Sequence, residues 1–126
     1  MSKNSTLEKI KQSVLAISAV ESYIHPSDEM YSFRCLIQTK YGELVVTIHK
    51  SDFTEAGEPR KRDNLASIFC CFSDYELAKE YLKQEKGMGN CNQKFNFHCS
   101  GGESAQERWD ACLSNFLDKV GRIVIK

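Results

Sequence analysis

The sequence predicts a single small α+β domain over residues 1–126, with a mostly antiparallel sheet and about three helices packed on it. Three observations lead to this class. The chain has 126 residues, which is about the length of one domain. Two alternating segments joined by a short turn predict a β-hairpin over residues 31–50. The remaining segments alternate between strand and helix periods, so the expected element order is α-β-β-β-α-β-α-β.

The first predicted element is a helix over residues 5–20. Ser5 and Glu8 have the S-x-x-E spacing of a capping box, and apolar residues then recur at helical spacing. Residues 14–24 contain several β-branched side chains, so a longer helix and an extended segment both stay open there. Pro26 then favours a loop, because the residue before a proline is biased away from helix.

The hairpin over residues 31–50 is the element that the pattern determines best. Apolar residues alternate with polar ones on both strands: Tyr31, Phe33, Cys35 and Ile37, then Leu44, Val46 and Ile48. With Tyr41-Gly42 as a two-residue turn, Ile37 pairs with Val46 and Cys35 with Ile48. Lys40 then pairs with Glu43 beside the turn, and His49 lies opposite Arg34 on the polar face. Both apolar sets share one face in this register, and a one-residue slip would separate them.

A polar loop over residues 51–64 follows the hairpin, and the apolar run over residues 65–72 predicts a central strand buried on both faces. A second capping box, Ser73 to Glu76, opens a helix that ends at Gly87. The side chains expected to face inward from this helix are Leu77, Ala78, Tyr81 and Leu82.

The last part of the chain predicts a short strand, a helix and a closing strand. The short strand covers residues 94–99, and a third capping box, Ser104 to Glu107, begins a helix that ends at Gly121. Its expected core residues are Trp109, Cys112, Leu113, Phe116 and Leu117. Residues 122–126 form the expected final strand, with Ile123 and Ile125 on one face.

Composition excludes several classes of protein. Lys and Arg number 17 and Asp and Glu also number 17, so the net charge argues against a domain that binds nucleic acid directly. No apolar run has the roughly 18 residues of a membrane span. The N-terminal residues lack an apolar signal-peptide core, which predicts a cytoplasmic protein. The six cysteines are therefore expected as free thiols, and Cys35 and Cys112 as small core residues.

Residues 97–105 carry the first candidate site. Cys99 is expected between the end of a strand and the start of a helix, where glycines and the helix terminus favour a thiolate and an anion. The segment resembles the H-C-x-x-G-x-x-R loop of cysteine-dependent phosphatases, with which it shares His98, Cys99 and Gly102. Ala105 stands where that family has its phosphate-binding arginine.

The same segment is also similar to the active loop of rhodanese sulfurtransferases, often C-x-S-G-x-R-S-A, although it is one residue shorter and has Glu103 in place of arginine. Either resemblance implies an enzyme, or a former enzyme, in which Cys99 is the nucleophile and His98 its neighbour. The likeness covers about ten residues, and no other part of the chain shows a motif of either family.

A metal site is a further alternative for this region. Cys91, His98 and Cys99, with Cys70 or Cys71, would supply zinc ligands. The chain has no C-x-x-C pair, and neighbouring residues of a strand point to opposite faces. The sequence therefore predicts no metal and no cofactor, with zinc as the alternative. No catalytic triad is predicted around His25 or His49.

The third candidate is the charged loop over residues 51–64. It contains Arg60, Lys61 and Arg62 with Glu58 close by, and loops longer than about 12 residues are usually functional or disordered. Because acidic residues surround the basic run, an acidic protein surface is the expected partner.

The sequence favours a non-enzymatic protein-binding or regulatory module over the enzyme that uses Cys99, because no complete catalytic site is visible. Small soluble proteins of phages and mobile elements that inhibit host defence complexes are of this kind. A homo-oligomer stays open.

Overall fold

The computed structural model describes residues 5–17, 19–22, 31–60, 65–84, 97–100 and 104–125. Within these ranges the elements follow in the order α1 (Thr6–Ala16), β1 (Ala19–Ser22), β2 (Tyr31–Thr39), β3 (Gly42–His49), the 3₁₀ turn η1 (Lys50–Asp52), β4 (Leu65–Phe72), α2 (Tyr75–Gln84), β5 (Phe97–Ser100) and α3 (Ala105–Gly121). The α+β class is confirmed, and the predicted order is matched apart from β1 and the final strand.

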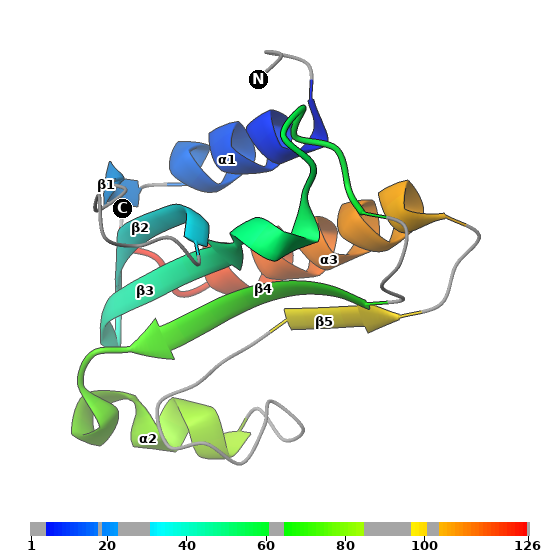
Figure 1. The fold of residues 1–126 in the computed structure, drawn as a ribbon. Coiled ribbons are helices and arrows are strands. Elements are labelled where there is room, and N and C mark those ends of the chain that lie inside the picture. The colour runs from blue at the N-terminus through cyan, green and yellow to red at the C-terminus, as the bar shows by residue number, and fades with distance from the viewer. Residues whose placement is uncertain are drawn as a thin grey trace.

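The five strands form one antiparallel sheet whose spatial order, β1-β2-β3-β4-β5, is the same as their order in the sequence. Figure 1 shows α1 and α3 close together beside the sheet, while α2 lies beyond the end of β4. Of the segment left open, residues 14–16 still belong to α1, whereas Ala19–Ser22 are extended and form β1. Residues 18, 23 and 24 lie outside the described residues.

The core lies between the helices and one face of the sheet. Every second residue of the three central strands is buried on this face: Phe33, Cys35, Ile37, Leu44, Val46, Ile48, Ala66, Ile68, Cys70 and Phe72. The helices contribute Leu7, Ile10, Val14, Ala78, Tyr81, Trp109, Cys112, Phe116 and Val120. The period-two pattern of the hairpin therefore identified its buried face correctly, because successive strand residues point to opposite faces.

The predicted hairpin register was wrong by two residues. Thr39 pairs with Gly42, so the turn consists of Lys40 and Tyr41, and Ile37 lies opposite Leu44. The Thr39 hydroxyl accepts a hydrogen bond from the Tyr41 backbone N–H (3.0 Å) and donates one to the Gly42 carbonyl (2.7 Å). These bonds stabilise a turn one residue earlier than predicted. A two-residue shift keeps each side chain on its face, which is why the buried set was still correct.

Two polar pairs change with this register. Gln38, rather than Lys40, pairs with Glu43, and Arg34 lies opposite Thr47 rather than His49. His49 pairs with Tyr31 and stacks on Phe69, with a ring-centroid distance of 4.5 Å.

The strand β4 is fully buried on one face and only partly buried on the other, where Ser67 is 6% exposed. Its core-facing residues are fully covered, whereas Phe69 and Cys71 on the opposite face are half-buried. The prediction of burial on both faces was therefore wrong for these two residues. The uninterrupted apolar run concealed the difference, because it lacks the polar alternation that marks a partly exposed face.

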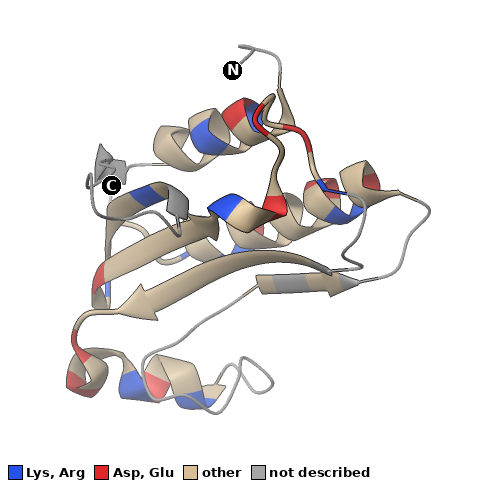
Figure 2. Ribbon diagram, viewed as in Figure 1, with Lys and Arg blue, Asp and Glu red and all other residues tan. Residues whose placement is uncertain are grey.

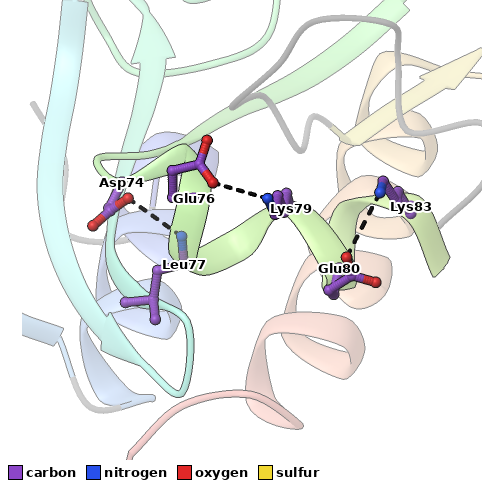
Figure 3. Close-up of polar contacts among 6 residues, drawn as sticks. All are labelled: Asp74, Glu76, Leu77, Lys79, Glu80 and Lys83. Atoms are coloured by element: carbon purple, nitrogen blue, oxygen red, sulfur yellow. Dashed lines mark hydrogen bonds and ion pairs between the residues drawn. The ribbon is translucent and has the colours of Figure 1, made fainter.

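The α2 helix differs from its prediction in its cap and its inner face. Asp74, not Ser73, is the N-cap, and its Oδ1 accepts the Leu77 backbone N–H at 3.3 Å (Figure 3). Ser73 instead donates its hydroxyl to Glu43 Oε1 at 2.9 Å. Ala78 and Tyr81 face the core and Leu82 is half-buried, but Leu77 is 54% exposed. Glu76–Lys79 and Glu80–Lys83 form ion pairs along the exposed side of this helix (Figure 3). The expected stop at Gly87 lies outside the described residues.

The other two caps are as predicted. Ser5 accepts the Glu8 N–H at 3.2 Å, and Ser104 accepts the Glu107 N–H at 3.1 Å. On α3, Leu113 and Leu117 are half-buried beside the fully buried core residues. The expected strand over residues 94–99 is β5, and residues 94–96 lie outside the described ranges.

The expected final strand is reduced to one bridge. Val124 pairs with Thr39, and both Ile123 and Val124 are buried while Ile125 is 53% exposed. Ile123 and Ile125 therefore do not share a buried face. The backbone N–H groups of Ile123 and Val124 both bond to the Val120 carbonyl, so the chain still turns out of α3 where the sequence predicted an extended segment.

Candidate functional site

The residues from the end of β3 to Arg60 form a loop that we call the tethered loop, residues 50–60. It contains two of the four predicted partner-binding residues, Glu58 and Arg60, both of them exposed. Lys61 and Arg62 lie outside the described residues. The described part carries two basic and three acidic side chains, so it has no positive excess of its own.

The tethered loop has its own internal hydrogen bonds. The Thr54 N–H donates to the Glu58 carbonyl (2.8 Å), and the Glu58 N–H returns to the Thr54 hydroxyl (3.2 Å). The Gly57 N–H bonds to the Thr54 carbonyl at 2.9 Å, and Gly57 has φ +84°, a conformation that favours glycine. Phe53 pairs with Pro59 at the base of the loop. These bonds set the backbone path of the whole segment.

Phe53 anchors the base of the loop in the core. Its side chain is only 3% exposed and packs on Trp109 of α3, with ring centroids 4.7 Å apart. The Phe53 carbonyl accepts the side-chain Nε–H of Arg60 at 3.1 Å, and the Arg60 backbone N–H bonds to the Asp52 carbonyl at 3.0 Å. Arg60 therefore helps to hold the loop together, in addition to presenting a charge at the surface.

Two contacts join the loop to the first turn of α1 (Figure 1). The Gly57 carbonyl accepts the Leu7 backbone N–H at 2.9 Å, one of the N–H groups that a helix start cannot satisfy internally. The Thr6 hydroxyl lies 2.8 Å from Glu58 Oε1. The negative charge of Glu58 thus lies at the positive end of the α1 dipole, a stabilising arrangement.

A third contact joins the first turn of α1 to α3. The same Thr6 hydroxyl lies 2.7 Å from Gln106 Oε1, and the Gln106 side-chain amide donates to Asp110 Oδ1 at 3.1 Å. Figure 2 shows that acidic and basic residues alternate over this end of the molecule. The sequence pattern did not indicate Thr6 or Gln106, because they are far apart in the chain and belong to no motif.

Cys99 lies within β5 and pairs with Ala66, so it shares the core face of the sheet, where it is half-buried. The sequence had placed it between the strand and the helix. The first residue of α3 is Ala105, and the hydroxyl of its cap, Ser104, is occupied by the Glu107 N–H. Arg108, on the second turn of α3, is 9% exposed. Residues 101–103 and the side chain of His98 lie outside what the structure describes.

Cys35, Cys70 and Cys112 are buried in the core, and their thiols are inert at neutral pH. Burial raises the pKa of the Cys35 and Cys112 thiols to about 12 and raises the pKa of Cys70 well above its ordinary value. The Cys112 thiol donates to the Phe97 carbonyl at 3.4 Å. All five cysteines in the described ranges are free of disulfides. The core interpretation of Cys35 and Cys112 is therefore confirmed.

Within the described ranges, no three His, Cys, Asp or Glu side chains are placed to hold a metal ion. Of the proposed zinc ligands, Cys70, Cys71 and Cys99 belong to those ranges, whereas Cys91 and the His98 side chain do not. His25 lies outside them as well. The tethered loop is therefore the candidate site for which the structure supplies a complete local geometry.

None of the helices in the described part has the length and apolar character needed to cross a membrane. Searches with protein-family models, curated proteins and solved structures find nothing that matches this chain.

Proposed function

We propose that this protein is a non-enzymatic protein-binding or regulatory module whose contact surface is the tethered loop. The observation that carries this proposal is the set of bonds from Gly57 and Glu58 to Leu7 and Thr6, which fix an exposed loop on the helical scaffold. A rigid scaffold that presents a loop is a common basis of binding. The partner would be another cytoplasmic protein, and a small inhibitor of a host defence complex would act in this way.

The tip of the loop offers side chains that the scaffold does not use. Glu55 and Ala56 are exposed at the turn, between Thr54 and Gly57, which hold the turn by hydrogen bonds. Because the backbone is already held in one path, a partner would not have to order it, and the entropic cost of association falls. The mixture of Glu55, Glu58 and Arg60 suits a partner surface that carries both signs of charge.

The proposal is tested by enlarging the tip without touching its tethers. Ala56→Arg adds a long side chain at the exposed turn, and Ala111→Arg makes the same change on the exposed side of α3. Tagged wild-type protein and both variants are used to capture partners from a lysate of the source cells. We expect the wild type and Ala111→Arg to retain the same partner and Ala56→Arg to lose at least nine-tenths of it. Equal capture by all three would contradict the proposal.

A second variant tests the basic run predicted from the sequence. Replacing Arg60, Lys61 and Arg62 with alanine should weaken capture, and it should lower the melting temperature only by what the single hydrogen bond from Arg60 to the Phe53 carbonyl contributes. Lys79→Ala/Lys83→Ala on α2 is the control, because it also removes exposed lysines, far from the loop in sequence (Figure 3). Unchanged capture by the triple variant would remove the basic run from the contact surface.

A further inference from the structure

An open hollow of about 590 Å³ lies where the β2–β3 turn meets the segment after α3. Its lining residues are Lys40, Gly121, Arg122, Val124 and Ile125. None of them belongs to the tethered loop or to the Cys99 strand. A volume of this size falls within the range of ligand sites, and an open shape suits a peptide segment better than an enclosed small molecule.

The backbone of the hollow is a short extended segment that bonds to β2 on one side and keeps one carbonyl, that of Val124, on the other. The Lys40 N–H bonds to the Ile123 carbonyl (2.7 Å), and the Ile125 N–H bonds to the Gln38 carbonyl (3.1 Å). Val124 lies between Ile123 and Ile125 and faces Thr39, but neither of these two hydrogen bonds involves it. Its own N–H and carbonyl therefore point away from β2. The Val124 N–H bonds to the Val120 carbonyl at 3.1 Å. The Val124 carbonyl accepts nothing from the described residues and is an acceptor for an incoming backbone N–H.

Two cationic side chains flank this edge. Lys40 is exposed and forms no ion pair with any residue that the structure describes. Arg122 has a 72% exposed side chain, and its Nη2 lies 3.2 and 3.0 Å from the two carboxylate oxygens of Asp118. An exposed pair of this kind is weak, so a carboxylate of a partner can replace Asp118 at little cost.

The hollow also has an apolar element. Ile125 is 53% exposed, one of the most exposed large apolar side chains among the described residues. Val124 is buried beneath it, and a Cβ atom added to Gly121 would meet no atom within 4 Å, so the floor is open. An exposed aliphatic side chain in a hollow that two cations also line favours a ligand that combines acidic and apolar groups.

We propose that this hollow binds an extended acidic segment of a protein partner. Carboxylates of the segment pair with Lys40 and Arg122, an apolar side chain packs on Ile125, and a backbone N–H donates to the Val124 carbonyl. Main-chain hydrogen bonds to an extended peptide are an established part of peptide recognition. The site is separate from the tethered loop, so the two proposals stand or fall independently.

A nucleic acid fits the hollow less well, although its phosphates would also attract Lys40 and Arg122. Its backbone has no regular N–H donors for the Val124 carbonyl, and it gains little from an exposed isoleucine. The chain as a whole has no net charge, whereas binding to a polyanion depends on a positive excess.

The test is a titration of ¹⁵N-labelled protein, followed by amide chemical shifts, with three probes. The first probe is a pool of acetylated hexapeptide amides that combine Glu and Asp with one Val, Ile or Leu. The second is a matched pool in which Lys and Arg replace the acidic residues. The third is a single-stranded oligothymidylate. We expect the acidic pool alone to shift the amides of Lys40, Gly121, Arg122, Val124 and Ile125. Shifts by both peptide pools alike, shifts elsewhere only, no shifts, or tighter binding of the oligonucleotide would overturn the proposal.

Three variants test which side chains bind the acidic peptides. Lys40→Gln/Arg122→Gln should weaken binding of the acidic pool at least tenfold, and Lys79→Ala/Lys83→Ala should leave it within twofold. Asp118→Asn should strengthen binding, because it removes the carboxylate that competes for Arg122. Equal affinity for the wild type and the Gln double variant would overturn the proposal. The amide spectrum of each variant, recorded before titration, shows that its fold is intact.

Discussion

The side-chain oxygens of Thr6 and Gln106 lie 2.7 Å apart although the two residues are separated by 100 positions in the chain. Glu58 Oε1 lies 2.8 Å from the same hydroxyl, which has one hydrogen and donates it to one of these two oxygens at a time. One threonine thus contacts both α3 and the loop between β3 and β4. Thr6 is 5% exposed, which shields these contacts from water. The side chain of Thr6 therefore links the tethered loop to α3, in addition to the backbone bond between Leu7 and Gly57.

Thr6→Val should therefore loosen the tethered loop. Valine keeps the shape of threonine but removes the hydroxyl, so we expect a loss of about 1 kcal/mol in the free energy of unfolding. Amide hydrogen exchange at Leu7, whose N–H bonds to Gly57, should speed up. Urea unfolding and exchange by NMR measure the two effects. Thr47→Val, on the half-buried face of β3, is the control and should change stability by less than about 0.5 kcal/mol. Unchanged exchange at Leu7 would show that the backbone bond alone holds the loop.

Gly42→Ala should destabilise the β2–β3 hairpin. Gly42 has φ +94°, and an added Cβ would lie 3.0 Å from Leu77 Cδ2. The backbone conformation alone costs about 1–3 kcal/mol for a residue with a side chain. Thermal unfolding of Gly42→Ala and of Gly42→Ala/Leu77→Ala separates the two causes. We expect the double variant to recover only the small part that is due to the contact, and full recovery would assign the whole cost to Leu77.

Stability should fall as the pH rises above about 9. The Cys35 and Cys112 thiols have an ordinary pKa of 9.0 and a folded-state pKa of about 12, because burial disfavours the thiolate. Above pH 9 the unfolded chain loses protons that the folded chain keeps, so the unfolded state gains stability until the pH passes 12. Urea midpoints at pH 7, 9 and 10.5 measure this slope. Cys35→Ala/Cys112→Ala should show a shallower decline, and an equal decline would refer the effect to other groups.

Thiol labelling should follow burial. At pH 8 iodoacetamide should modify the half-buried Cys71 and Cys99 of the folded protein before Cys35, Cys70 and Cys112, which require unfolding. Peptide mapping after timed labelling gives the order. The same experiment at pH 6 tests the alternative function, since a nucleophilic Cys99 would react faster than a simple thiol. Reaction of Cys99 no faster than glutathione at that pH counts against the phosphatase-like and rhodanese-like hypotheses.

Local patterns predicted the fold well where they extend over several residues. Alternation identified the buried face of the hairpin, and the Ser5 and Ser104 capping boxes marked two helix starts correctly. The predictions failed where the hydrogen bonds of one side chain decide at which of two neighbouring residues a turn or a helix begins. The Thr39 hydroxyl moved the turn by one residue, and Asp74 capped α2 because Ser73 bonds to Glu43 on a neighbouring strand.

The candidate site was predictable only in outline. The length and charge of the loop drew attention to Glu58 and Arg60, but their roles as tethers come from contacts across the fold. Glu58 and Thr6 are 52 residues apart, and no local pattern records such a pairing. The hollow beside Lys40 likewise depends on the bridge between Thr39 and Val124, which joins distant parts of the chain.

The strand order of the sheet has a consequence for synthesis on the ribosome. Because the strands pair in the order in which they are made, the sheet can extend strand by strand as the chain emerges. The burial of α1 is completed later, because α1 packs on α3, which is translated after every strand, as well as on β1. At roughly 5–20 residues per second, the apolar face of α1 would wait about 5–20 s for α3. A nascent chain stalled before α3 would therefore leave part of that face, which carries Leu7, Ile10 and Val14, uncovered and open to molecular chaperones.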